Sequence, residues 1–173
     1  MNEALILPWG GHTPVVARTA FLARNATLIG DVTLADQSSV FYGAVLRADG
    51  GTIRLGERSN LQDNVTVHAD PGTPTMIGKG VSVGHAAMLH SCIIEDNCLI
   101  GMSATVLTGA VIGTGSLVAA GAVVLEGTII PPNSLVLGMP AKVHRELNAQ
   151  QMEHVRMNAE HYVEFGRLHA ELL

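Results

Sequence analysis

The sequence predicts an all-β solenoid, a parallel β-helix, followed by one C-terminal α-helix. Three observations lead to this prediction: aliphatic residues recur every six positions, small residues follow them at a fixed offset, and glycine is frequent while aromatic residues are rare. The chain has 173 residues, of which 19 are glycine and 3% are aromatic. A short fixed period is the signature of a solenoid, and a six-residue period indicates a β-helix. We place this solenoid at residues 15–141.

The aliphatic repeat runs through most of the chain in four registers. They comprise Val16, Leu22, Leu28, Leu34, Val40 and Leu46; then Leu55, Leu61 and Val67; then Ile77, Val83 and Leu89; then Ile94, Ile100, Val106, Ile112, Val118, Val124, Ile130 and Val136. Each aliphatic side chain would fill the interior of a triangular prism with three short strands per coil. β-branched residues and glycines every few positions argue against short helices as the source of the period.

The pattern changes character after Val143. Asn148 followed by Gln151 resembles an N-cap with its capping box. Apolar residues then recur near helical spacing, which predicts an amphipathic helix over roughly residues 148–172, packed along the prism. The expected organisation is a β-helix with an N-terminal cap segment, residues 1–144, and a helical segment, residues 145–173.

Composition excludes several classes of function. The net charge is −5, and no basic run suggests a nucleic acid or a membrane surface as partner. The N-terminus lacks the pattern of a signal peptide, and no apolar stretch approaches a membrane span. The two cysteines, Cys92 and Cys98, offer no disulfide framework, so we expect a cytoplasmic protein.

Breaks in the repeat are the natural places for a site, because loops on a rigid scaffold often carry function. The step from Leu46 to Leu55 is nine residues, which inserts about half a repeat around residues 48–52. The step from Val67 to Ile77 is ten residues and predicts a protruding loop at residues 69–76. The step from Leu89 to the next repeat position is five residues.

Two histidines are predicted to stand above one another beside these breaks. Counting each irregular step as one face places Arg47, His68 and His90 at equivalent positions on three successive coils. Neighbouring strands lie about 4.7–4.9 Å apart, so the two imidazoles would be within reach of one small ion. The remaining histidines are expected to be solvated: His12, His144, His154, His161 and His169.

A third histidine, His85, falls on a different face. It shares a column with Asp63, and Gln62 is the neighbour of Asp63 in the sequence. Because His85 cannot easily reach the other two within one chain, it would have to join them in a neighbouring subunit. Repeating such a contact around a triangular prism closes a ring, and a homotrimer is the natural solution. The sequence therefore predicts a metal site shared across a subunit interface.

Three imidazoles without a fourth protein ligand describe an open metal site. Zinc in such a site can carry a water molecule and lower its pKa to about 7. A structural zinc site usually recruits a fourth ligand, often cysteine, and neither cysteine is close in the repeat geometry. Iron or cobalt would suit the same donors.

Two stretches of the chain resemble the γ-class carbonic anhydrases, and in particular the short carbonic anhydrase-like hexapeptide-repeat proteins. They are VLRADGGTIRLGERSNLQDNVTVH at residues 45–68 and IGKGVSVGHAAMLHSCIIEDNCLIGM at residues 77–102. The most specific elements are N-x-x-x-H, which ends at His68, and G-H-x-x-x-x-H, which contains His85 and His90. The resemblance covers nearly the whole chain. It implies a left-handed β-helix, a homotrimer, and a zinc site built from His68 and His90 of one subunit and His85 of another, acting on CO2 and bicarbonate.

The same resemblance implies roles for residues around the metal. Arg47 and Asp63 would pair across the interface, and Asp49 would have a structural role beside Arg47. Gln62 would contact the metal-bound water or bicarbonate. The segment NAEHYVEF would bring an asparagine and a tyrosine towards the metal pocket, which are Asn158 and Tyr162 in this chain.

One departure from the family pattern concerns proton transfer. The best-studied active members carry an acidic loop and a further glutamate that move protons out of the site. Here Gly50 follows Asp49, and Asp70 is the only acid in the loop after His68. Because hydration must release a proton in each cycle, the missing groups predict a low turnover rather than a loss of metal binding.

Three other functions stay open at this point. A hexapeptide acyltransferase with an acyl-CoA donor could use His85, but it would leave His68 and His90 unexplained. A non-catalytic trimeric scaffold or assembly subunit would need no hydration activity. A metal-dependent hydrolase of small thioesters could use the same metal centre.

Overall fold

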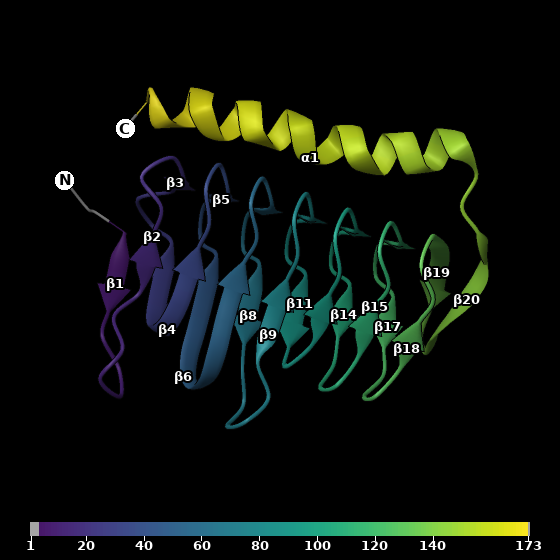
Figure 1. Ribbon diagram of the computed structural model, residues 1–173, viewed down its shortest axis with the longest axis horizontal. Coiled ribbons are helices and arrows are strands. Elements are labelled where there is room, and N and C mark those ends of the chain that lie inside the picture. The colour runs from purple at the N-terminus through teal and green to yellow at the C-terminus, as the bar shows by residue number, and fades with distance from the viewer. Residues whose placement is uncertain (1–3, 173) are drawn as a thin grey trace.

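The computed structural model describes residues 4–172 and shows the left-handed parallel β-helix that the sequence predicts, with one long helix along it (Figure 1). The solenoid has about seven coils. Each complete coil contributes one strand to each of three faces. Among the described residues, no helix is long and apolar enough to cross a membrane.

Two of the faces belong to one 12-stranded sheet, because two long strands bend from one face onto the other. The face that carries His68 and His90 is called the histidine face, and its neighbour in this sheet is called the third face. The histidine face comprises β1 (Leu5–Leu7), the first parts of β4 (Thr27–Leu34) and β6 (Val45–Leu55), β8 (Thr66–His68), β11 (Met88–His90), β14 (Thr105–Val106) and β17 (Val123–Val124). The third face comprises β2 (Val15–Val16), the later parts of β4 and β6, β9 (Thr75–Ile77), β12 (Ile93–Ile94), β15 (Val111–Ile112) and β18 (Ile129–Ile130).

The remaining face, called the helix face, is an eight-stranded sheet. It comprises β3 (Phe21–Leu22), β5 (Ser39–Val40), β7 (Asn60–Leu61), β10 (Ser82–Val83), β13 (Leu99–Ile100), β16 (Leu117–Val118), β19 (Ser134–Gly138) and β20 (Ala141–Glu146). β20 is antiparallel to β19, and this hairpin is not anticipated by the six-residue period. The nine-residue step after Leu46 also differs from the expected insertion, because β6 continues through it as one bent strand.

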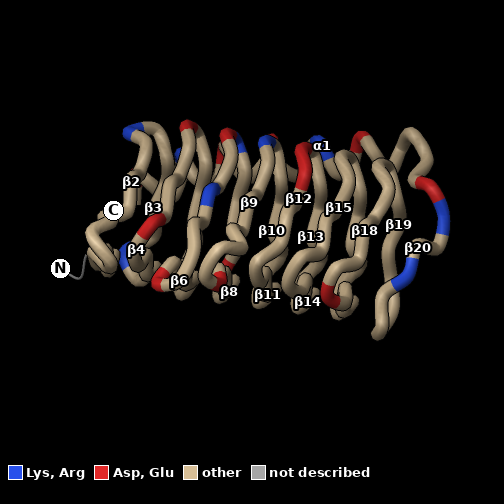
Figure 2. Tube along the Cα trace, turned by 60° about the horizontal axis from the view of Figure 1, so that its bottom comes forward, with Lys and Arg blue, Asp and Glu red and all other residues tan. Residues whose placement is uncertain are grey.

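The repeat positions form the core of the prism. Leu28, Leu46, Leu61 and Leu89 are all fully buried, which confirms that one aliphatic side chain per repeat fills the interior. Charged residues of the solenoid gather instead at its edges, where the coils turn (Figure 2). The buried aliphatic residues therefore fix the strand register, and the corners can accommodate charged and metal-binding side chains.

Helix α1 (Ala149–Ala170) runs back along the helix face, from the last coils to the first (Figure 1). Its start is as predicted: the Gln151 backbone N–H donates to Asn148 Oδ1 over 2.9 Å, and the Asn148 N–H donates to Gln151 Oε1 over 3.2 Å. Gly166 allows a close approach of the helix to β5, because a Cβ there would lie 3.1 Å from the Ser39 Cβ. The solenoid ends in β20 at Glu146 and the helix begins at Ala149.

One expectation about the helix is wrong. His169 is half-buried rather than solvated, and its Nδ1 lies 2.9 Å from the Tyr42 hydroxyl. Its ring also packs against Phe21 and Phe41. The helical phase places His169 on the same stripe as Tyr162 and Gly166, so it faces the prism.

Candidate metal centre and the pocket beside helix α1

His68 and His90 stand on adjacent coils at the ends of β8 and β11. The strand register pairs His90 with His68, and His68 with Arg47, as the column analysis predicts. His68 Nδ1 lies 3.0 Å from His90 Nε2. Parallel strand spacing thus brings two imidazole nitrogens face to face near the surface of the prism.

The outward nitrogens of both rings have their own partners. His68 Nε2 donates to Asp49 Oδ1 over 3.0 Å, and His90 Nδ1 lies 3.0 Å from Thr108 Oγ1. An imidazole whose outer nitrogen donates a hydrogen bond presents a lone pair on the inner nitrogen. Two lone pairs facing each other repel unless a cation or a proton lies between them. The donor chemistry of this pair therefore fits a shared metal ion.

Asp49 supports this arrangement electrostatically. It forms an ion pair with Arg47 as well as its bond to His68. The His68 hydrogen bond, followed by the bond to Arg47, lowers the pKa of the Asp49 carboxyl below its ordinary value. Asp49 therefore stays ionised and holds the His68 ring in one orientation. Arg47, His68, Asp49, His90 and Thr108 together are called the paired-histidine site.

The structure adds a residue that sequence reasoning did not assign to the metal. Asp70 Oδ1 lies 3.7 Å from His68 Nδ1, and Asp70 Oδ2 lies 3.7 Å from His90 Nδ1. Ligand atoms of His68, Asp70 and His90 all lie within 4.8 Å of one another. The sequence signal for this is the alternation of His68, Ala69 and Asp70, which is typical of a strand with one face buried. Ala69 is fully buried, so its two neighbours point outward together.

His85 lies at a different corner of the prism, in the turn between β10 and β11. Its Nδ1 lies 2.8 Å from Asp63 Oδ2, so the predicted column of Asp63 and His85 is present. Ala86, directly after His85, has a left-handed φ of 58° where the chain turns the corner. Within the described chain, the metal-capable group around His68 and His90 does not include His85.

The predicted pair of Arg47 and Asp63 is likewise not formed within one chain. Arg47 pairs with Asp49, and Asp63 pairs with His85. These two residues belong to the two corners that the histidine face separates. Their mutual pairing was expected across an interface and stays a prediction.

Four of the predicted residues line one pocket between α1 and the corner that carries His85. The predicted residues in it are Gln62, His85, Asn158 and Tyr162, and the pocket also includes Leu99, Met102, Leu117 and His154. We call this cavity the helix pocket. Gln62 is buried, and its Nε2 donates to Asn60 Oδ1 over 3.3 Å, which orients the amide.

Asn158 and Tyr162 occupy one stripe of α1 facing this pocket. Asn158 Oδ1 is buried and has no hydrogen-bond partner among the described residues. Such an acceptor costs free energy unless a ligand or water donates to it. Burial, and secondarily the charge of Asp63, raises the pKa of the Tyr162 hydroxyl, so this group stays protonated at neutral pH.

The two cysteines are not candidates for the metal. Both are free and buried, and burial raises the pKa of each thiol to about 12. Cys92 lies two residues after His90 but points into the prism. This agrees with the prediction that neither cysteine completes the ligand set.

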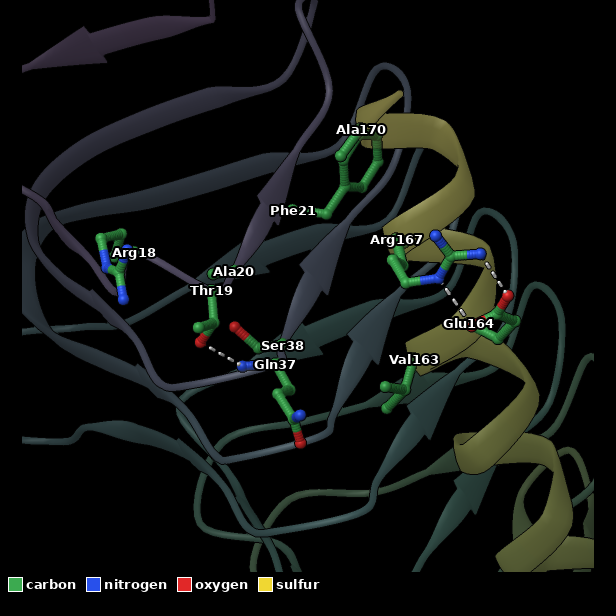
Figure 3. Close-up of a pocket in the computed structure, with 11 residues that line it drawn as sticks. Arg18, Thr19, Ala20, Phe21, Gln37, Ser38, Val163, Glu164, Arg167 and Ala170 are labelled. Carbon is green, nitrogen blue, oxygen red and sulfur yellow. Dashed lines mark hydrogen bonds and ion pairs between the residues drawn. The ribbon is translucent and has the colours of Figure 1, made fainter. Parts of the chain in front are cut away.

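A second hollow lies between the end of α1 and the first coils (Figure 3). Several of its polar groups bond to one another: the Gln37 N–H donates to Thr19 Oγ1 over 3.1 Å, and Arg167 is bound to Glu164. It contains none of the predicted site residues. We therefore assign the site to the two corners described above.

Comparison with known proteins places these features in a family. The family model for the bacterial transferase hexapeptide, six repeats, matches residues 91–126. A protein of Methanocaldococcus jannaschii named "Probable carbonic anhydrase" is 55% identical over 152 residues, which are 88% of this chain and 96% of that protein. The carbonic anhydrase of Geobacillus kaustophilus is 43% identical over 168 residues, 97% of this chain and 92% of that protein.

A solved structure points to the same fold under another name. A Bacillus cereus protein, described as a candidate acetyltransferase, superposes with a TM-score of 0.97 at 40% identity over 99% of both chains. The hexapeptide fold hosts several activities, so the name of a structural neighbour says little about the site. The near full-length identity to carbonic anhydrases decides the family. The chain belongs to the carbonic anhydrase family of hexapeptide-repeat proteins.

Proposed function

We propose that this protein is a metal-dependent carbonic anhydrase that catalyses the reversible hydration of CO2 to bicarbonate. The metal, which we propose is zinc with iron or cobalt as other candidates, would be held by His68 and His90 of one subunit and His85 of its neighbour in a homotrimer. The observation that carries the proposal is the facing pair of imidazole nitrogens, 3.0 Å apart and each backed by a hydrogen-bond partner. Such backing is typical of metal-ligating histidines.

The outward side chains of the histidine face support the proposed trimer. One column of paired positions crosses seven strands of this face without a charged residue. Its members are Leu5, Thr27, Val45, Thr66, Met88, Thr105 and Val123. An uncharged strip of this length suits burial between copies of the chain. It runs between the corner of His85 and the corner of His68 and His90, so a three-fold arrangement around this face would bring these corners together.

When bound, a zinc ion among three neutral imidazoles supplies the Lewis acidity that makes water a nucleophile at neutral pH. The chain's own residues would do the remaining work. Gln62 and Asn158 would hydrogen-bond the attacking water or the bicarbonate product, and the unpartnered Asn158 Oδ1 can accept a hydrogen bond from either. The Tyr162 hydroxyl, protonated at neutral pH, would donate to a carboxylate oxygen of the product. The apolar walls of the helix pocket suit CO2, which carries no charge.

Proton release is the step that we expect to be slowest in this chain. Tyr162 holds its proton too tightly to act as a base near pH 7. We therefore propose a turnover limited by proton transfer to buffer. We also propose a cytoplasmic location, since the two cysteines are free thiols that suit a reducing compartment.

An acyltransferase is the alternative that the Bacillus cereus neighbour suggests. It needs one catalytic histidine, which His85 at the helix pocket could supply. It gives no reason for the paired-histidine site, in which Asp49 and Thr108 orient two rings towards each other. A purely structural trimer subunit leaves the same pair unexplained.

The test is to measure metal content and CO2 hydration on one anaerobically purified sample, beside His90→Ala. About one metal ion per subunit with hydration lost in the variant is the expected result. Metal without hydration would move the function towards acyl transfer, thioester hydrolysis or a scaffold. A protein without metal after anaerobic purification would overturn the proposal.

A further inference from the structure

We propose that Asp70 is an additional metal ligand, so that His68, His90 and Asp70 of one subunit can hold a divalent cation without the neighbour. This inference rests on the proposed metal site, but it changes its make-up and the order of its assembly. The observation behind it is the position of Asp70, whose Oδ1 lies 3.7 Å from His68 Nδ1, the nitrogen that faces His90. Its Oδ2 lies 3.7 Å from His90 Nδ1, the nitrogen turned to Thr108. Ligand atoms of His68, Asp70 and His90 all lie within 4.8 Å of one another.

The position of Asp70 is built into the fold rather than left to a free loop. Its backbone N–H donates to Ser91 Oγ over 2.8 Å, and it forms an isolated bridge with Thr73. Ser91 follows His90 directly, and its N–H donates to the carbonyl of His68 over 3.0 Å. These hydrogen bonds attach the backbone of Asp70 to the strands that carry His68 and His90.

Asp70 differs in role from Asp49, the other acid near His68. Asp49 accepts from His68 Nε2, the nitrogen that faces away from His90, and it is neutralised by Arg47. Asp70 lies near His68 Nδ1, the nitrogen that faces His90 Nε2. Asp70 has no ion pair with lysine or arginine among the described residues, so its charge is available to a cation.

Two histidines and one carboxylate form a ligand set suited to Fe²⁺, Co²⁺ or Zn²⁺, with open positions for further ligands. His85 of the neighbour would then be the last ligand to arrive, bound to a cation already present on one chain. A carboxylate in the set also favours iron and cobalt more than three imidazoles alone do.

The experiment measures Co²⁺ binding by visible absorption in His85→Ala, which removes the proposed ligand from the neighbour. We expect this variant to bind about one Co²⁺ per subunit, and the added change Asp70→Asn to weaken binding by about 100-fold or more. Glu146→Gln in the same background is the control, since Glu146 is an exposed acid in β20, the end strand of the helix face, and it should leave binding unchanged. The inference would be overturned if His85→Ala alone no longer bound Co²⁺, or if adding Asp70→Asn left the Co²⁺ affinity unchanged.

A second measurement guards against variants that fold poorly. In the otherwise unaltered protein, Asp70→Ala removes the oxygen donor, so the Co²⁺ absorption should intensify as the coordination number falls. An unchanged spectrum would count against Asp70 as a ligand. The proposed function fails separately: a metal-loaded, unaltered protein that does not hydrate CO2 would remove the anhydrase assignment and leave the Asp70 result standing.

Discussion

The paired-histidine site and the helix pocket are two corners of the same prism with opposite chemistry. At the paired-histidine site, side chains bond mainly to one another: His68 to Asp49, Asp49 to Arg47, and His90 to Thr108. The helix pocket presents polar groups and apolar walls, and one buried oxygen, on Asn158, has no partner among the described residues. We propose that the first corner holds an ion and that the second receives a small neutral molecule.

In the proposed trimer neither corner alone is sufficient for CO2 hydration, and this difference teaches how the fold can make assembly a condition of activity. Each coil places the corners on opposite edges of the histidine face, so one chain cannot join them. A neighbouring copy can join them by a simple rotation. The predictions below separate the metal-holding corner from the substrate-receiving corner.

The largest effect is expected at the metal-holding corner. His90→Ala removes a ligand, so metal content should fall from about one ion per subunit to below about a tenth. The solenoid should remain, because His90 is half-exposed and the core beneath it is formed by Leu89 and its neighbours. Elemental analysis and circular dichroism check both parts. Stoichiometric metal in the variant would break the assignment.

A smaller effect is expected for the support of His68. Asp49→Asn should weaken metal affinity by about 10–100-fold, because the carboxylate fixes the ring and raises its basicity. The pKa of Asp49 is lowered in the folded chain, so the ionised carboxylate stabilises the fold above about pH 4. This contribution to folding stability is lost as the pH falls through the lowered pKa. Carboxyl carbon shifts measured against pH report this directly. A midpoint at or above the ordinary value would contradict the account.

At the substrate-receiving corner, stability and activity should separate. Asn158→Ala removes a buried acceptor that has no partner, so the free energy of unfolding should fall by less than about 1 kcal/mol or rise. CO2 hydration should fall by about 10-fold with metal content unchanged. Chemical denaturation and stopped-flow hydration measure the two quantities. Parallel losses of stability and metal would show that Asn158 is structural.

The smallest effect is expected for the thiol nearest the metal. Burial raises the pKa of Cys92 and Cys98 to about 12, so iodoacetamide at pH 8 should label neither until the chain is unfolded. Cys92→Ala should leave metal content unchanged. Protection of Cys92 that depends on bound metal would instead place this thiol in the site.

The sequence predicted the columns of the site well because the six-residue period fixes which residues share a face. Arg47, His68 and His90 were assigned to one ladder by counting, and the strand register confirms it. The same counting assigns Asp63 and His85 to a second ladder, and the 2.8 Å distance between Asp63 Oδ2 and His85 Nδ1 agrees with it.

Features outside the period could not be predicted in the same way. Asp70 lies in the loop where the repeat breaks, so its approach to the histidines depends on its bond to Ser91. The antiparallel strand β20 carries no six-residue pattern. His169 was misjudged because its contacts with Tyr42 and Phe41 join segments far apart in the sequence.

The most direct test of a site shared between subunits is complementation by two inactive variants. His85→Ala lacks the ligand from one corner, and His90→Ala lacks a ligand from the other, so each homotrimer should be inactive in CO2 hydration. Random co-assembly of equal amounts leaves about a quarter of the interfaces with all three histidines, and hydration should return to about that fraction. A co-assembled mixture no more active than either variant alone would contradict the account.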